Sequence, residues 1–97
     1  MVTQAYDIGD TRRLEATFKD IAGVLTDPTA VTFTMEEPDG TITTYNTVGA
    51  NLKNPSVGVY HVDWPLAKAG RHAIEFIGTG AVAQTVAYEL WAKRSNA

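Results

Sequence analysis

The sequence predicts an all-β fold, an Ig-like antiparallel β-sandwich of about seven short strands. Apolar residues and threonines alternate along several segments, best from Ala30 to Glu37, where Val31, Phe33 and Met35 share one face. Turn signals containing Gly, Pro, Asn or Asp recur every ~8–12 residues. No segment carries an unambiguous helical pattern. Together these observations indicate a small sandwich of two packed sheets.

The N-terminal third begins with a brief strand over Tyr6–Asp10, which closes in a Gly-Asp turn. Residues 12–19 alternate strictly, with Leu14, Ala16 and Phe18 on one face, as in a half-buried strand. Residues 20–23 suit a four-residue hairpin loop, and Val24-Leu25 forms a short return. A corner follows at residues 26–29, because Pro28 cannot lie in a central strand.

After the Ala30–Glu37 strand, Pro38-Asp39-Gly40 predicts a tight turn. Pro and Asp suit its central positions, and Gly supplies the positive φ of a bulge. The next strand, Thr41–Tyr45, is expected to point Ile42 inward and Thr41 and Thr43 outward. The stretch Asn46–Pro55 is expected to be a loop or a poorly formed edge strand.

In the C-terminal half, residues 57–64 alternate and Pro65 ends the strand. Residues 66–70 form a turn, 71–77 the next strand, and 78–80 the last turn. Residues 81–91 are ambiguous, because Val82, Val86 and Leu90 recur at a helical spacing of four. A strand is favoured over a helix, since Gly-Thr-Gly fits a hairpin return better than a helix cap.

One domain over residues 5–92 is expected, with flexible ends at 1–4 and 93–97. Its predicted core consists of the inward-facing residues of the proposed strands: Leu14, Phe18, Val31, Phe33, Met35, Tyr60, Val62, Trp64, Ile74 and Phe76. Gly58 beside Tyr60 suits a packed corner, with the tyrosine hydroxyl bonded to the backbone.

Composition excludes several functional classes. The 97 residues include no cysteine, so disulfides and thiol chemistry are absent, and the net charge of −3 gives no reason to expect nucleic-acid binding. No apolar run approaches the roughly 20 residues of a membrane helix. The start of the chain has neither the basic nor the apolar region of a signal peptide. The expectation is therefore synthesis in the cytoplasm, without secretion by a signal peptide and without membrane insertion.

No enzyme, cofactor or metal site is predicted, because no recognised catalytic motif occurs. His61 and Asp63 share a strand face and would need a third ligand to hold a metal, so they are interpreted as a solvated outer face. His72 is interpreted as a half-buried residue at the core edge. The acidic group Glu36, Glu37 and Asp39 is interpreted as solvated charge beside a turn.

The segments 6–18, 27–33, 38–41 and 58–64 together resemble small Ig-like β-sandwich proteins encoded among the head, neck and tail genes of tailed bacteriophages and prophages. Residues 69–80 resemble the penultimate strand and turn of that group. The chain departs from it at His72 and Ile74, where the typical member has aromatic residues. The match covers about residues 5–91 and carries no catalytic residue.

The resemblance implies a non-enzymatic virion structural protein: a head-decoration, head-completion, neck or tail component, assembled in the host cytoplasm in multiple copies. Its partners would be other capsid, neck or tail subunits, not nucleic acid or membrane. Docking is expected through sheet edges and loop tips, with the ends of the chain and four polar loop residues as candidate contacts: Asn46, Asn51, Lys53 and Asn54. The alternative is an Ig-like module that binds carbohydrate or a host surface, which would need exposed aromatic residues.

Overall fold

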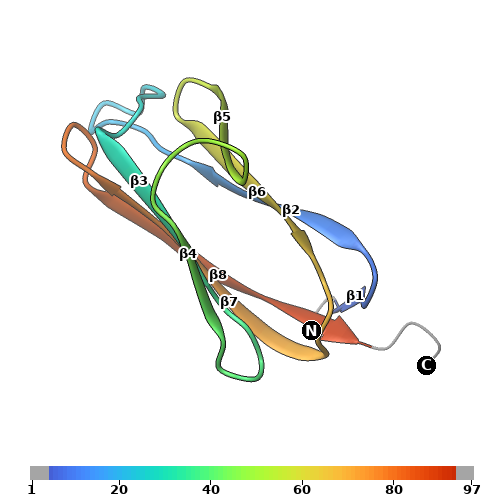
Figure 1. The fold of residues 1–97 in the computed structure, drawn as a ribbon. Coiled ribbons are helices and arrows are strands. Elements are labelled where there is room, and N and C mark those ends of the chain that lie inside the picture. Colours follow the sequence, from blue (N-terminus) through green and yellow to red (C-terminus); the bar gives the residue numbers. More distant parts are fainter. Residues whose placement is uncertain (1–4, 94–97) are drawn as a thin grey trace.

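The protein is a two-layered β-sandwich in the computed structural model, which describes residues 5–93 (Figure 1). The expected flexible residues 1–4 and 94–97 lie outside the described residues. The strands are β1 (Ala5–Asp7), β2 (Thr11–Thr17), β3 (Ala30–Glu36), β4 (Ile42–Tyr45), β5 (Leu52–Ser56), β6 (Val59–Pro65), β7 (Gly70–Thr79) and β8 (Gln84–Lys93). The Ig-like sandwich predicted from the alternation is confirmed, and Lys93, expected in a flexible end, belongs to β8.

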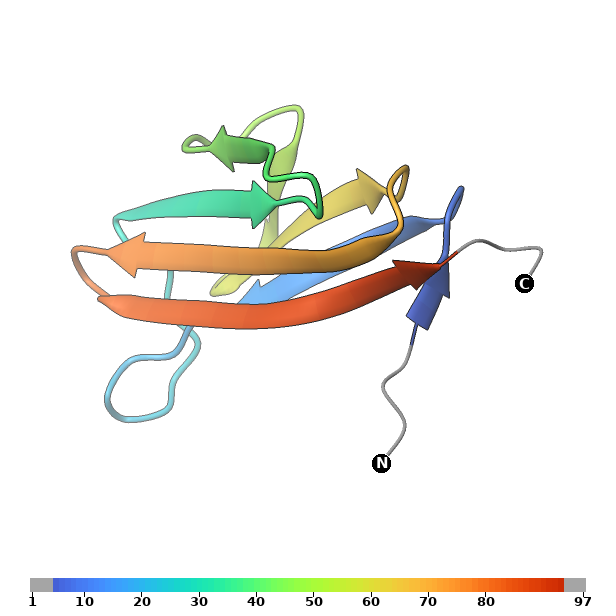
Figure 2. The same ribbon diagram turned by 90° about the horizontal axis from the view of Figure 1, so that it is seen from below.

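One sheet has five strands in the order β1-β8-β7-β3-β4, and the other has three in the order β2-β6-β5. In Figure 2, β8, β7, β3 and β4 lie side by side, with β4 at the edge remote from β8. The pairs are antiparallel except β1 with β8, which is parallel. A parallel pair is possible there because the two strands are far apart in sequence and no hairpin constrains their direction.

The core lies between the sheets, and all ten residues predicted to form it are buried. Phe33 is at the centre of an aromatic cluster, with ring centroids 5.1 Å from Phe76, 5.6 Å from Tyr45 and 6.1 Å from Trp64. Leu52 and Leu66 are also buried, although the sequence placed them in a loop and a turn. Both contribute to the core from segments in which apolar and polar residues do not alternate, so the sequence did not indicate their burial.

The predicted direction of Ile42 was wrong: its side chain is 63% exposed. The β3–β4 register pairs Met35 with Thr43 and Phe33 with Tyr45. Directly opposed residues of an antiparallel pair point to the same face, so Thr43 and Tyr45 share the inner face of Met35. The hairpin turn sets this register, and it overrides the preference of an isoleucine for the core.

The final segment is a strand, as favoured, and β7 and β8 pair along their whole length from Gly70–Ala92 to Gly78–Gln84. The last turn therefore lies later than predicted, since Gly78 and Thr79 belong to β7. Gly78 is buried, and a Cβ there would lie 2.8 Å from Cγ of Pro28. A glycine is needed at this position because β7 packs closely against Pro28, and not because the chain turns there.

Both histidines are more buried than predicted. His72 is 0% exposed, with Nδ1 3.2 Å from the Gly70 carbonyl oxygen, so it belongs to the core and not to its edge. His61 is 8% exposed, although its face of β6 was expected to be solvated. It lies on the central strand of its sheet, opposite Glu15 on one side and Lys53 on the other. Neighbours on both sides shield a central-strand residue more than an edge residue.

A tyrosine hydroxyl does bond to the backbone, but it belongs to Tyr88 and not to Tyr60. The Glu15 N–H donates to the Tyr88 hydroxyl oxygen at 2.9 Å, and that hydroxyl lies 3.2 Å from the Glu15 carbonyl oxygen. Burial raises the pKa of Tyr88. The Tyr60 ring instead packs edge-on against Phe18, and its hydroxyl is 3.5 Å from the Asp27 carboxylate. Tyr88 thus ties β8 of one sheet to β2 of the other.

Replacing Tyr88 with phenylalanine is expected to lower the free energy of unfolding by about 1–2 kcal/mol, because two hydrogen bonds between the sheets are lost. Urea denaturation of the variant measures this loss. Tyr45→Phe is the matched control, since no hydrogen bond of the described residues involves its hydroxyl. An equal loss of unfolding free energy in both variants would show that the hydrogen bonds of the Tyr88 hydroxyl do not stabilise the sandwich.

Candidate functional site: loop end, outer face and sheet edges

The residues considered for catalysis do not assemble into a site. Among residues 5–93, no group of three or more His, Asp or Glu side chains could hold a metal ion. Asp63 forms an ion pair with Arg13 at 2.9 Å, while Nδ1 of His61 is buried without a hydrogen-bond partner. Glu37 and Asp39 both bind Lys68, at 3.4 and 2.8 Å. These acidic groups are therefore engaged in surface ion pairs.

The acid sensitivity of these ion pairs gives a testable result. The guanidinium of Arg13 lowers the pKa of Asp63, and the ammonium of Lys68 lowers that of Asp39 well below its usual range. Stability from carboxylates with depressed pKa values is fully present above the unfolded value of about 3.9 and is lost as pH falls through the folded values. We expect the urea midpoint to fall between pH 5 and pH 2 in wild type.

The matched variant is Asp39→Asn with Asp63→Asn. It should be less stable than wild type at neutral pH, and the difference should shrink on acidification. Parallel pH profiles for the two proteins would show that the ion pairs contribute nothing measurable, as is common for exposed pairs.

The four predicted contact residues differ in exposure. Asn46, Asn51 and Lys53 are exposed, as an interface requires. Asn54 is half-buried, and its amide donates at 2.8 Å to the carbonyl oxygens of Ser56 and Val59. These bonds hold the β5–β6 turn together, so the structure gives Asn54 a local structural role.

A group of exposed apolar side chains, which the sequence did not single out, lies at one end of the sandwich. We call this the loop end; it consists of Ile21, Val24, Leu25 and Val57, exposed by 107%, 58%, 45% and 57%. Leu25 lies against Gly58 of the β5–β6 turn, and a depression of about 410 Å³ separates Ile21 from the β7–β8 turn. Figure 1 shows these connections together at the upper left, and in Figure 2 the β2–β3 connection projects from the sheets.

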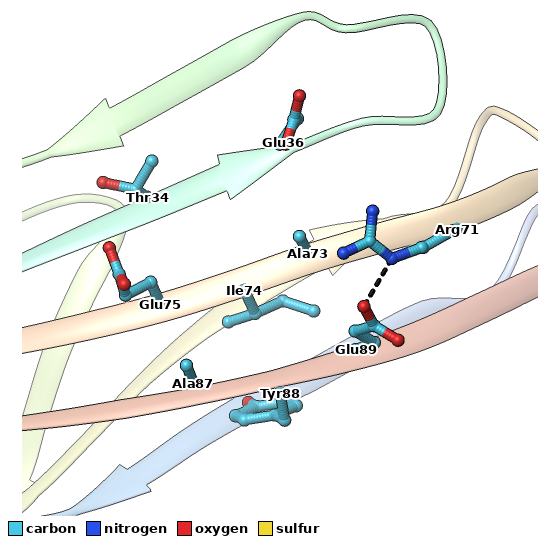
Figure 3. Close-up of a pocket in the computed structure, with 9 residues that line it drawn as sticks. All are labelled: Thr34, Glu36, Arg71, Ala73, Ile74, Glu75, Ala87, Tyr88 and Glu89. Carbon is cyan, nitrogen blue, oxygen red and sulfur yellow. Dashed lines mark hydrogen bonds and ion pairs between the residues drawn. The ribbon is translucent and has the colours of Figure 1, made fainter.

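The outer face of the five-stranded sheet carries a shallow depression of about 430 Å³ (Figure 3). The small side chains of Thr34, Ala73 and Ala87 form much of its floor. Glu36, Glu75 and Glu89 stand around it, and Arg71 pairs with Glu89. Glu36 and Glu75 have no ion-pair partner among the described residues. The face is therefore acidic beside β3 and β4.

The free edges differ in how far they are blocked. At the β2 edge, Tyr88 occupies the N–H and C=O of Glu15. The β5 edge contains Lys53, Pro55 and an irregular register between Lys53 and Ser56. The lysine, the proline and the irregular register of β5 each discourage the addition of a further strand. The β4 edge, with the sequence Ile-Thr-Thr-Tyr, has no proline, charge or irregularity.

Comparisons with known proteins show the fold and no family. No family model matches the chain, and no curated protein matches its sequence. Among solved structures, the chain is similar to the crystal structure of the Lin-41 filamin domain. The TM-score is 0.70 at 13% identity, over 94% of this chain and 84% of that chain. The protein therefore has an Ig-like β-sandwich fold. Within residues 5–93, no helix is long and apolar enough to cross a membrane.

Proposed function

We propose that this protein is a non-enzymatic structural component of a bacteriophage virion, a head-decoration, head-completion, neck or tail subunit that works by docking onto neighbouring subunits. The resemblance of its segments to such proteins supports the virion assignment. The observation that carries the docking role is the loop end, where four apolar side chains are exposed together. Grouped exposed apolar residues are typical of protein interaction sites.

Burial of such side chains at an interface supplies affinity, at about 25 cal/mol for each Å² removed from water. Ile21 is fully exposed on a connection that projects from the body, so it can enter a partner's apolar pocket without rearrangement of the sandwich. Repetition of a modest contact by virion symmetry strengthens it through avidity.

Mass spectrometry of purified particles from the producing strain tests the virion role, with presence at a stoichiometry of many copies as the expected result. Absence from particles, with the protein present in the lysate, would overturn it. Ile21→Asp with Val57→Asp should then reduce incorporation without lowering the melting temperature. Ala69→Asp, exposed at the opposite end of the sandwich, is the matched control.

A second candidate function, carbohydrate or host-surface binding, is favoured by Trp91. This indole is 42% exposed and lies opposite Arg71, close to the acidic depression. Trp64, in contrast, is 8% exposed and packs in the core. A glycan array with wild type and Trp91→Ala tests this candidate: binding lost in the variant would support it, and no binding by wild type would exclude the glycans tested.

A further inference from the structure

We propose that the β4 edge accepts an extended segment of a partner protein as an additional strand, with apolar residues opposite Ile42 and Thr43 and a lysine or arginine opposite Thr44. This deepens the proposed docking function, because it gives the chemistry of one partner segment. The inference rests on the backbone groups that β4 leaves free, on the absence of proline, charge and irregularity in β4, and on the carboxylates of Glu36 and Glu75, which have no ion-pair partner within residues 5–93.

The free backbone groups follow from the hairpin register. The Glu37 N–H donates to the Thr41 carbonyl oxygen at 2.8 Å, and the register from Glu36–Ile42 to Phe33–Tyr45 continues this pairing. In an antiparallel pair, hydrogen-bonded and non-hydrogen-bonded residues alternate. Thr43 and Tyr45 therefore bond to β3, and the N–H and C=O groups of Ile42 and Thr44 point to the open side.

The side chains beside these groups define what an added strand would contact. Ile42 is exposed on the outer face, so an apolar residue opposite it would bury both. The next residue of the added strand points inward, beside half-buried Thr43 and the ring of Tyr45, which packs on Phe33. An apolar side chain there would extend the core at its open margin.

Charge complementarity predicts the residue of the added strand that lies opposite Thr44. Across the outer face, Ile42 is in line with Glu36, and Thr44 is in line with Thr34 and Glu75. The added strand would lie about 9.5 Å from β3, two strand spacings away. A lysine or arginine opposite Thr44 can span that distance, because Thr44 and Thr34 are short and leave room above them. It would approach Glu36 of β3, and Glu75 on β7, one strand spacing further away, adds to the negative charge of this face. Neither carboxylate has an ion-pair partner among the described residues.

The peptide Thr-Lys-Val-Ile-Val-Lys-Thr is a suitable probe, since its palindromic sequence reads the same parallel or antiparallel to β4. Titrated into the ¹⁵N-labelled protein, it should slow hydrogen exchange of the Ile42 and Thr44 amides. The control peptide Thr-Glu-Val-Ile-Val-Glu-Thr should bind at least about fivefold more weakly at low salt. Glu36→Gln with Glu75→Gln should reduce this preference, whereas Glu15→Gln, on the other sheet, should not.

Thr44→Pro removes an N–H that β3 does not use, so the sandwich should keep its fold and peptide affinity should fall about tenfold or more. Ile42→Lys provides a second variant that blocks the edge without changing the backbone. Several results would overturn the proposal: protection at β5 or β2, equal affinity for both peptides, or Ile42 and Thr44 amides protected by self-association without peptide. The last would assign the edge to a second copy of the chain.

These measurements use the isolated protein, so they are independent of the particle experiment. Failure of the peptide to bind, with the protein present in particles, would reject the strand-acceptor edge and leave the virion role. If the peptide binds at β4 but this protein is absent from particles, the virion role is rejected and the strand-acceptor edge is retained.

Discussion

Replacing Gly58 with alanine is expected to destabilise the protein by about 2–5 kcal/mol. Gly58 has a φ of +75°, a left-handed conformation that costs a residue with a Cβ about 1–2 kcal/mol. An added Cβ would also lie 2.6 Å from the Phe18 carbonyl oxygen and 3.0 Å from the Thr26 nitrogen. Both are backbone atoms that cannot rotate away, so overpacking adds about 1–3 kcal/mol.

The backbone of Gly58 also holds this corner together. Its carbonyl oxygen accepts from the Phe18 N–H at 2.7 Å, and its own N–H donates to the Asp27 carboxylate at 2.7 Å. A displacement that relieved the clash would strain these bonds. The glycine therefore couples β2, the β2–β3 connection and the start of β6.

Gly23→Ala is the matched control for this prediction. Gly23 has a similar φ of +83°, but nothing lies within 4 Å of its added Cβ. Urea denaturation of both variants separates the backbone cost, shared by the two, from the steric cost, specific to Gly58. Equal destabilisation would show that the corner relaxes around the methyl group.

Replacing Phe33 with alanine is expected to cost about 3–5 kcal/mol, a large part of the stability of a domain of this size. Phe33 is 0% exposed and lies between Phe76, Tyr45 and Trp64, so its loss leaves a cavity that three rigid rings cannot fill by small shifts. A marked fall in melting temperature should accompany a rise in the accessibility of Trp64.

Ile21→Ala is the control for the core prediction. It also removes a large apolar side chain, but one that is fully exposed, and it should change stability by no more than about 0.5 kcal/mol. If Phe33→Ala were as mild as this control, the aromatic cluster would have to repack around the gap. Unchanged quenching of Trp64 fluorescence would support that outcome.

Much of the fold follows from local patterns. Alternation in residues 12–19, 30–36 and 57–64 placed three strands and their buried faces, because a half-buried strand repeats its environment every two residues. Pro38-Asp39-Gly40 placed the turn, and Gly40 has the expected positive φ of +90°. Features that depend on pairing were less accessible: the face of Ile42, the burial of Leu52 and the length of β7.

The candidate docking surfaces were also predicted only in part. The sequence indicated docking through edges and loops, but it directed attention to polar residues such as Asn54, whose amide bonds within its own turn. The loop end was missed, because Ile21 and Val57 are 36 positions apart and each is unremarkable alone. An apolar residue inside a predicted loop, such as Ile21 between Asp20 and Gly23, was the one available signal.

The threonine and apolar alternation by itself determined that this chain forms strands and which faces most of them bury, and the Gly, Pro, Asn and Asp residues between them determined where most turns fall. The physical reason is that steric limits on the backbone and the burial of alternate side chains act within a few residues. Only the tertiary structure decided that β4 exposes Ile42, that Tyr88 closes the β2 edge, and that the β4 edge is left open. Those outcomes depend on register and on contacts between residues distant in sequence, which no local pattern encodes.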